Sequence, residues 1–99
     1  MAVVEWSVPA FDQLEALPTS VAYDIIQRVD LRDSFPELGV KLNGPPALAR
    51  CRQLIVERKY RVIYEFDSAL NTIWILAVQH CRQKLPRARA LNRAKESLE

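Results

Sequence analysis

Arginines and a single histidine in the second half of the chain are the residues best suited to chemistry. Arg50 and Arg52 lie two apart in a run of extended residues, so both project on the same side of that run. Arg61 follows in the next extended run, and a guanidinium group on an open sheet face grips anions through paired hydrogen bonds. His80 is the only histidine, the side-chain type that most readily exchanges protons near neutral pH. These residues predict an exposed basic groove lined by Arg52 and Arg61.

The cysteines do not add a metal or redox site to this prediction. A structural zinc site takes four ligands at paired short spacings, whereas Cys51, His80 and Cys81 offer three, two of them adjacent. Two cysteines also make no disulfide framework, so reduced thiols are expected. We therefore expect neither a metal nor a cofactor.

The charge of the chain is unevenly distributed. Residues 1–49 hold three basic and seven acidic side chains, whereas residues 50–95 hold eleven basic and three acidic ones. No acidic residue lies between Asp67 and Glu96. This asymmetry is typical of a protein whose C-terminal half meets a polyanion or an acidic partner, although a solvated charged surface would look the same.

Length and composition favour one globular domain over residues 1–99. An apolar fraction of 49% with 26% charged residues is ordinary for a folded protein and excludes a disordered chain. The longest apolar run, Ile73 to Val78, is far shorter than the roughly 20 residues that a membrane-spanning helix needs. The N-terminus lacks the pattern of a secretory signal, so we expect no membrane association and a cytoplasmic location.

The first half of the chain predicts a strand followed by two helices. Residues 3–8 are rich in β-branched and aromatic residues, and Pro9 closes this strand. Apolar residues recur every three positions over residues 10–17, which predicts a helix that Pro18 stops. Thr19 or Ser20 then caps a second helix, which ends before Phe35 and packs on the first as a hairpin.

The second half predicts three consecutive antiparallel strands. The two glycines and two prolines of residues 39–46 indicate a loop, after which the strands span residues 47–56, 60–66 and 72–79. In the middle strand one face is expected to be core; it carries Tyr60, Val62, Tyr64 and Phe66. Residues 84–99 form a basic terminal helix or arm. The fold class is α+β, with the two-helix hairpin packed on an antiparallel sheet that contains this three-strand meander.

Three motifs in this order resemble those of the RelE/ParE toxin superfamily. They read Lys41-Leu42-Asn43-Gly44, Tyr60-Arg61-Val62-Ile63-Tyr64-Glu65 and Val78-Gln79-His80-Cys81-Arg82, and the resemblance spans roughly residues 3–86. Members of this superfamily are small bacterial toxins that an antitoxin encoded beside them neutralises. Some cleave messenger RNA in the ribosomal decoding site, whereas others poison DNA gyrase without cutting RNA.

The resemblance assigns roles to individual residues. RNA cleavage without a metal needs a proton acceptor, a proton donor and cations for the charge that builds on phosphorus. Arg61 lies where the family motif has a phosphate-binding arginine, Arg52 is a plausible second cation, and His80 moves protons. Leu85 stands where the nuclease branch has a catalytic tyrosine, a role that His80 could take over. The expected substrate-binding residues are Arg50, Lys41, Lys59, Arg82 and Lys84.

Three functions follow from the resemblance. The first is a toxin that inhibits translation as a ribosome-dependent endoribonuclease, with the cognate antitoxin and messenger RNA on the ribosome as partners. The second is a non-nucleolytic poison of DNA gyrase that binds its target through the basic C-terminal half. The third is an attenuated relative that only binds an antitoxin.

Overall fold

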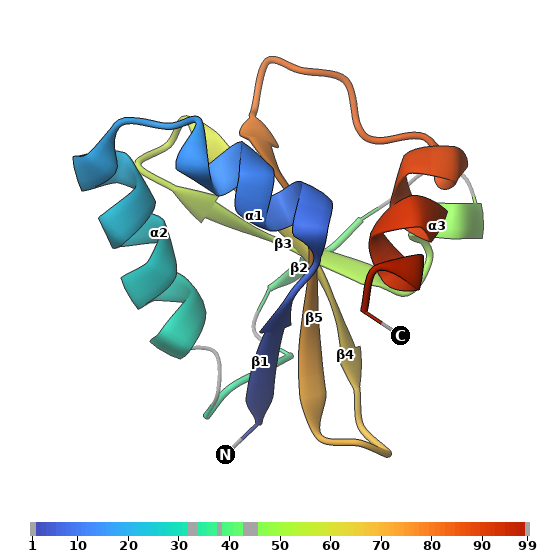
Figure 1. The fold of residues 1–99 in the computed structure, drawn as a ribbon. Helices are drawn as coiled ribbons and strands as arrows, with labels where there is room; N and C mark the ends of the chain where they lie inside the picture. Colours follow the sequence, from blue (N-terminus) through green and yellow to red (C-terminus); the bar gives the residue numbers. More distant parts are fainter. Residues whose placement is uncertain (1, 32–33, 38, 43–45, 99) are drawn as a thin grey trace.

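The computed structural model describes residues 2–31, 34–37, 39–42 and 46–98. Within them a sheet is flanked by helices on both faces (Figure 1). The elements in chain order are β1 (Val3–Trp6), α1 (Val8–Glu15), α2 (Thr19–Asp30), β2 (Val40–Lys41), the 3-10 helix η2 (Pro46–Leu48), β3 (Cys51–Val56), β4 (Tyr60–Asp67), β5 (Thr72–His80) and α3 (Ala88–Glu96). The α+β fold expected from the sequence is confirmed. No helix in these described ranges has the length and apolar character to cross a membrane.

The five strands are arranged in the order β1-β5-β4-β3-β2. The meander of β3, β4 and β5 is antiparallel, as predicted, and β2 adds a short antiparallel edge within the expected loop. β1 pairs with β5 in parallel, so the sheet is mixed and not wholly antiparallel. Residue patterns indicate that a segment is extended, whereas the direction of β1 follows from the path of α1 and α2 across the sheet.

Local hydrogen bonds account for the shifted element boundaries at the N-terminal end. The expected strand over residues 3–8 stops at Trp6 because Ser7 caps α1, its Oγ accepting a hydrogen bond of 3.2 Å from the N–H of Ala10. Pro9 therefore lies in the first turn of α1, where a missing N–H has no cost. The residue that caps α2 is Pro18, and neither Thr19 nor Ser20 makes the predicted cap.

The second half differs from expectation at three places. The strand expected over residues 47–56 begins only at Cys51, because Pro46–Leu48 is a 3-10 helix. β4 and β5 each run one residue further than predicted. The C-terminal segment resolves as a helix, α3, whose buried residues Leu91 and Ala94 hold it against the sheet. Asn43 and Gly44 of the first family motif lie outside the described residues.

Two apolar cores lie on opposite faces of the sheet. One packs under α1 and α2, and it contains the predicted face of β4, with Val62 and Tyr64 fully buried. The other packs under α3 and includes Ile63 and Cys51. Figure 1 shows α1 and α2 on one side of the molecule and α3 with η2 on the other. The sequence did not predict this second core, because charged residues within the strands indicated an open face.

A bulge in β5 changes which face its residues occupy. Tyr64 pairs with Ile75 and Ile63 pairs with Ala77, so Leu76 is the extra residue of β5. Leu76 and Ala77 consequently both pack in the core under α3, whereas Ile75 and Val78 pack under α1 and α2. Each residue of β5 beyond the bulge therefore points to the face opposite to the one that strict alternation would give it.

Candidate functional site

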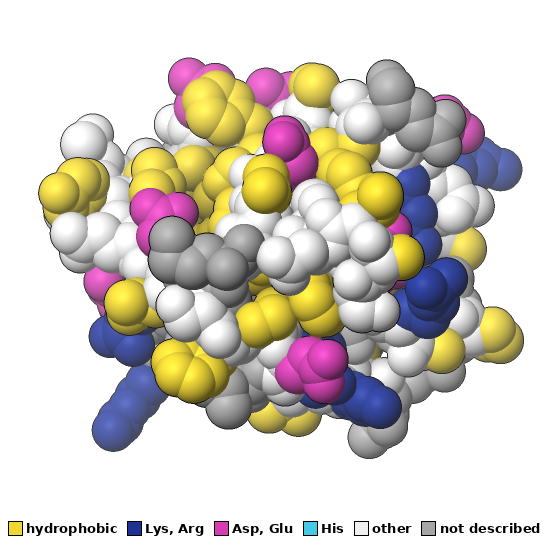
Figure 2. Space-filling view, turned by 90° about the horizontal axis from the view of Figure 1, so that it is seen from below, with side chains coloured by type: hydrophobic (Ala, Val, Ile, Leu, Met, Phe, Trp, Pro, Cys, Tyr) yellow, Lys and Arg dark blue, Asp and Glu magenta, His cyan; other side chains and the backbone are white. Residues whose placement is uncertain are grey.

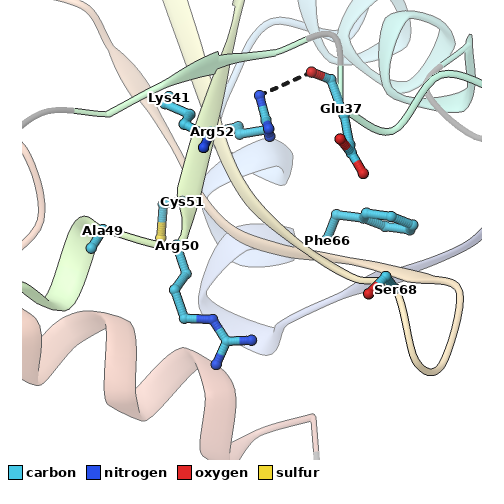
Figure 3. A pocket seen from close by; sticks show the side chains of 8 residues that line it. All are labelled: Glu37, Lys41, Ala49, Arg50, Cys51, Arg52, Phe66 and Ser68. Carbon is cyan, nitrogen blue, oxygen red and sulfur yellow. Dashed lines mark hydrogen bonds between the residues drawn. The ribbon is translucent and has the colours of Figure 1, made fainter.

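Three of the predicted site residues line one pocket at the edge of the sheet (Figure 3). This basic pocket has a volume of about 300 Å³. Lys41 comes from β2, Arg50 immediately precedes β3, and Arg52 lies in β3. The remaining lining residues are Glu37, Ala49, Cys51, Phe66 and Ser68. Among the described lining residues, three cations against one carboxylate give the pocket a positive charge.

Backbone carbonyl groups hold Arg52 in a fixed position. Its Nη1 donates hydrogen bonds of 2.9 Å to the carbonyl oxygen of Glu37 and 2.8 Å to that of Gly39. Arg52 also pairs with Lys41 across β2 and β3. The guanidinium group therefore ties the segment before β2 to the sheet, and only its remaining nitrogens are available to a ligand.

Arg50 points away from Arg52 toward a buried carboxylate, as Figure 3 shows for the two side chains. Its Nε lies 3.6 Å from Oε1 of Glu65, and 78% of the Arg50 side chain is exposed. Glu65 is only 9% exposed, and its Oε2 lies 2.9 Å from Nζ of Lys95 on α3. The Lys95 contact is an ion pair without the alignment of a hydrogen bond, since Oε2 has no hydrogen-bonding partner. Arg50 and Lys95 together compensate the charge of Glu65.

Cys51 lies beside this carboxylate. Burial raises the pKa of its thiol, the charge of Glu65 raises the pKa further, and Lys95 opposes that effect. The thiol is therefore held in its protonated form, which is a poor nucleophile. Among residues 2–31, 34–37, 39–42 and 46–98, no three His, Cys, Asp or Glu side chains cluster as a metal site.

Arg61 lies on the opposite face of the sheet from Arg52. Arg52 pairs with Tyr64, which is in the core under α1 and α2. Arg61 is opposite Ile55 and Gln79, on the other face. Cross-strand partners share a face, so the predicted groove lined by both arginines is wrong. The two arginines differ in their position relative to the core residues of their strands. Arg52 is on the same face as the residues of β3 that pack under α1 and α2, whereas Arg61 is on the face opposite to the corresponding residues of β4.

Polar groups surround Arg61 without satisfying it completely. Its Nη2 donates a hydrogen bond of 2.7 Å to the carbonyl oxygen of Cys81, but its Nε is buried without a partner. Oε1 of Gln53 and Oε1 of Gln79 are likewise buried without a partner. Sequence reasoning missed both glutamines. Their signal was a long polar amide within a strand, where glutamine is not a favoured residue.

His80 faces the helix side, next to α1. It pairs with Tyr60, and the two rings meet edge to face with centroids 5.5 Å apart. Its Nδ1 accepts a hydrogen bond of 3.0 Å from the N–H of Arg82. Because Arg61 is opposite Gln79, the neighbour of His80, the imidazole and the Arg61 guanidinium project from opposite faces. The three predicted catalytic residues are thus distributed over three separate environments.

The remaining predicted cations gather at the end of the sheet where β3 turns into β4. Lys59 lies in this turn, and its carbonyl oxygen accepts a hydrogen bond of 2.7 Å from the N–H of Cys81. Arg82 and Lys84 follow β5, and the carbonyl oxygen of Lys84 accepts a hydrogen bond of 3.1 Å from Nε2 of Gln79. All three side chains belong to exposed residues. Substrate binding by these cations stays a prediction.

Several solved toxin structures have the same fold. RelBE2 of Mycobacterium tuberculosis, a toxin-antitoxin complex, matches with a TM-score of 0.70 and 24% identity over 83% of this chain and 93% of that chain. The isolated RelE toxin of Escherichia coli matches with a TM-score of 0.71 and 16% identity over 94% of this chain and 98% of that one. The archaeal RelE-RelB complex of Pyrococcus horikoshii matches with a TM-score of 0.62 and 20% identity over 84% and 98%. At these identities the likeness is one of fold.

The sequence itself is assigned by a family model. A search among curated proteins found no match to the chain. The model that describes the ParE toxin of the type II toxin-antitoxin system parDE matches residues 4–85, which contain the sheet except Val3, together with α1, α2 and the predicted site residues. The chain therefore belongs to the ParE family of type II toxins.

Proposed function

We propose that this toxin acts in the cytoplasm by binding a protein target, DNA gyrase, and that it does not cleave RNA itself. The observation that carries this proposal is the separation of Arg52, Arg61 and His80. Metal-independent cleavage needs cations and a proton-transfer group around one phosphate, within hydrogen-bonding distance of the reacting atoms. Here Arg61 projects from one face, and Arg52 and His80 line different pockets on the other.

Exposed apolar side chains support a protein as the target. Leu31, Phe35 and Tyr23 each have more than 60% of their surface exposed. Figure 2 shows hydrophobic side chains at several places on one face, between acidic and other side chains, with Lys and Arg side chains mostly toward its rim. Apolar area with a polar, charged rim is the usual anatomy of a surface that binds another protein.

RNA cleavage is the competing function, and the basic pocket favours it. Lys41, Arg50 and Arg52 together provide the charge to hold a phosphate, and the fold is that of RelE. In that case the pocket would bind messenger RNA on the ribosome and a group outside it would transfer the protons. The two functions differ in their products, so one experiment separates them.

The test measures both products with the same protein. Purified toxin is added to DNA gyrase with supercoiled plasmid, and ribosome-bound message is mapped by primer extension after induction in cells. We expect cleaved DNA-gyrase complexes and no message fragments. Arg61→Ala and His80→Ala should retain toxicity, as should Arg28→Ala, an exposed arginine on α2 that serves as the control. Message fragments that disappear with Arg61→Ala but not with Arg28→Ala would overturn the proposal.

The antitoxin partner is expected to use the basic pocket. An acidic segment would place a carboxylate among Lys41, Arg50 and Arg52, and such pairs weaken as salt screens them. Affinity for the antitoxin should therefore fall between about 0.05 M and 0.5 M salt, as the screening length shortens several-fold. Arg50→Gln should reduce this salt dependence. A complex that is insensitive to salt would indicate that apolar contacts dominate.

A further inference from the structure

The edge of β5 that β1 leaves uncovered is closed by two glutamine side chains. β1 pairs with β5 only as far as Ile75, so no strand of the described ranges pairs with the outer edge from Val78 to His80. Oε1 of Gln13, on α1, accepts a hydrogen bond of 2.7 Å from the N–H of Val78. Oε1 of Gln83 accepts one of 2.8 Å from the N–H of His80. The outward N–H groups of this edge are therefore satisfied by side chains, as free sheet edges require.

Closing the edge in this way leaves three side-chain hydrogen-bond donors beside it. The side-chain oxygen of each glutamine already accepts a hydrogen bond from the strand. The group left to bind a ligand is the Nε2 amide, which donates two hydrogen bonds. His80 has committed Nδ1 to the N–H of Arg82, so Nε2 carries the ring proton and also donates. These three donors have no partner among the residues that the structure describes.

The donors line a cavity of about 440 Å³, which we call the donor pocket. It is bounded by Gln13, Ala16, Leu17, Tyr60, Val78, Gln79, His80 and Gln83. Within the described part of the chain, no Lys, Arg, Asp or Glu lines the donor pocket, in contrast to the basic pocket. Neutral donors without a cation match neutral acceptors such as peptide carbonyl groups better than phosphates, whose charge they would not compensate.

The spacing of the donors matches an extended peptide. Val78 and His80 are two residues apart in β5, so the amides bound to their N–H groups are set about 6.6 Å apart along the edge, two residues' rise of a strand. Alternate carbonyl groups on one side of an extended peptide have the same spacing. We propose that the donor pocket binds the main-chain carbonyl groups of an extended segment of the antitoxin. This inference rests on the antitoxin partner of the proposed function and not on gyrase as the target.

The test uses isosteric substitutions that keep the internal hydrogen bonds. Gln83→Glu and Gln13→Glu retain an oxygen to accept from His80 and Val78, but they lose the donating amide. Gln27→Glu adds the same charge on an exposed position of α2 and serves as the control. With the full-length cognate antitoxin in a calorimetric titration, each pocket variant should bind about tenfold more weakly, the factor that one ordinary hydrogen bond corresponds to. The control should bind within twofold of the wild type.

A second measurement identifies the occupant directly. The side-chain amide signals of Gln13 and Gln83 in ¹⁵N-labelled toxin should shift when antitoxin is added, and stay in place with single-stranded oligouridylate. Melting curves establish that the variants are folded. If both folded pocket variants bind the antitoxin with unchanged affinity, the inference is overturned and the proposed function stands. Amide signals that respond to the oligonucleotide would also overturn the inference. A wild-type toxin that binds no antitoxin would overturn both this inference and the antitoxin partner of the proposed function.

Discussion

Replacing Lys95 by Met removes the ion pair that fastens α3 to the sheet. Lys95 Nζ lies 2.9 Å from Oε2 of Glu65, a carboxylate that is 9% exposed. Met keeps the length and apolar stem of the side chain, so packing is largely preserved. The other cation near Glu65 is Arg50, at 3.6 Å and with most of its side chain in solvent. Lys95→Met therefore leaves a nearly buried carboxylate with weak compensation.

The expected loss follows from the geometry. At an effective dielectric constant of 20, two unit charges separated by this distance attract each other by about 6 kcal/mol. Most of that is offset by the desolvation of Glu65, and the Lys95 side chain keeps 40% of its surface in water. We expect a net loss of about 1.5 kcal/mol in the free energy of unfolding, which in a domain of this size lowers Tm by roughly 6–12 °C.

A double-mutant cycle isolates the pair. Urea unfolding of Lys95→Met, Glu65→Gln and the double variant can be followed by the fluorescence of Trp74, which lines the same small pocket as Lys95 and Glu65. The coupling energy should be about 1.5 kcal/mol, because the second substitution removes a charge already left without its partner. Arg93→Met, on the exposed side of α3, should change stability by less than about 0.5 kcal/mol. Additive effects of the two substitutions would refute the reasoning.

Three further predictions concern packing, turn geometry and thiol reactivity. Gly39→Ala should destabilise the fold by about 1–3 kcal/mol in thermal melts, because its Cβ would lie 2.8 Å from Cε1 of the buried Tyr64 ring and closer still to its hydroxyl. Arg58→Gly should raise Tm, since Arg58 adopts a left-handed φ of 59° in the β3–β4 turn, and an unchanged or lower Tm would contradict this. Cys81 should react with iodoacetamide at pH 8 well before Cys51, whose thiol pKa is raised by burial, and equal rates in peptide mapping would show that Cys51 is accessible and ionised. The same raised pKa means that stability is lost as pH rises above the ordinary thiol range, because the unfolded chain then ionises first.

The sequence predicted the elements well because their signals are local. The alternation Tyr60, Val62, Tyr64, Phe66 identified the buried face of β4 under the helices, and the apolar stripes of α1 and α2 identified both helices. The sequence did not decide whether the C-terminal segment is a helix or an arm, because its apolar residues are few. Its burial depends on a face of the sheet that the local pattern does not reveal.

The candidate site was predicted less well because it depends on long-range arrangement. The sequence identifies basic residues one by one. Whether two of them lie on the same face of the sheet depends on which residues of each strand point toward the core. Arg52 and Arg61 differ in this respect. The glutamines of the donor pocket carry no charge and follow no motif, and Gln13 meets β5 only through the packing of α1. No local pattern links residues so far apart in the chain.

The parallel pairing of β1 with β5 has a consequence for synthesis of the protein. Val3 pairs with Thr72, so β1, the first strand to be synthesised, can pair only after β5, the last strand, has been synthesised. A nascent chain that terminates anywhere before β5 lacks both the strand that joins β1 to the rest of the sheet and the edge that lines the donor pocket. Incomplete translation products therefore cannot assemble the complete sheet or the donor pocket.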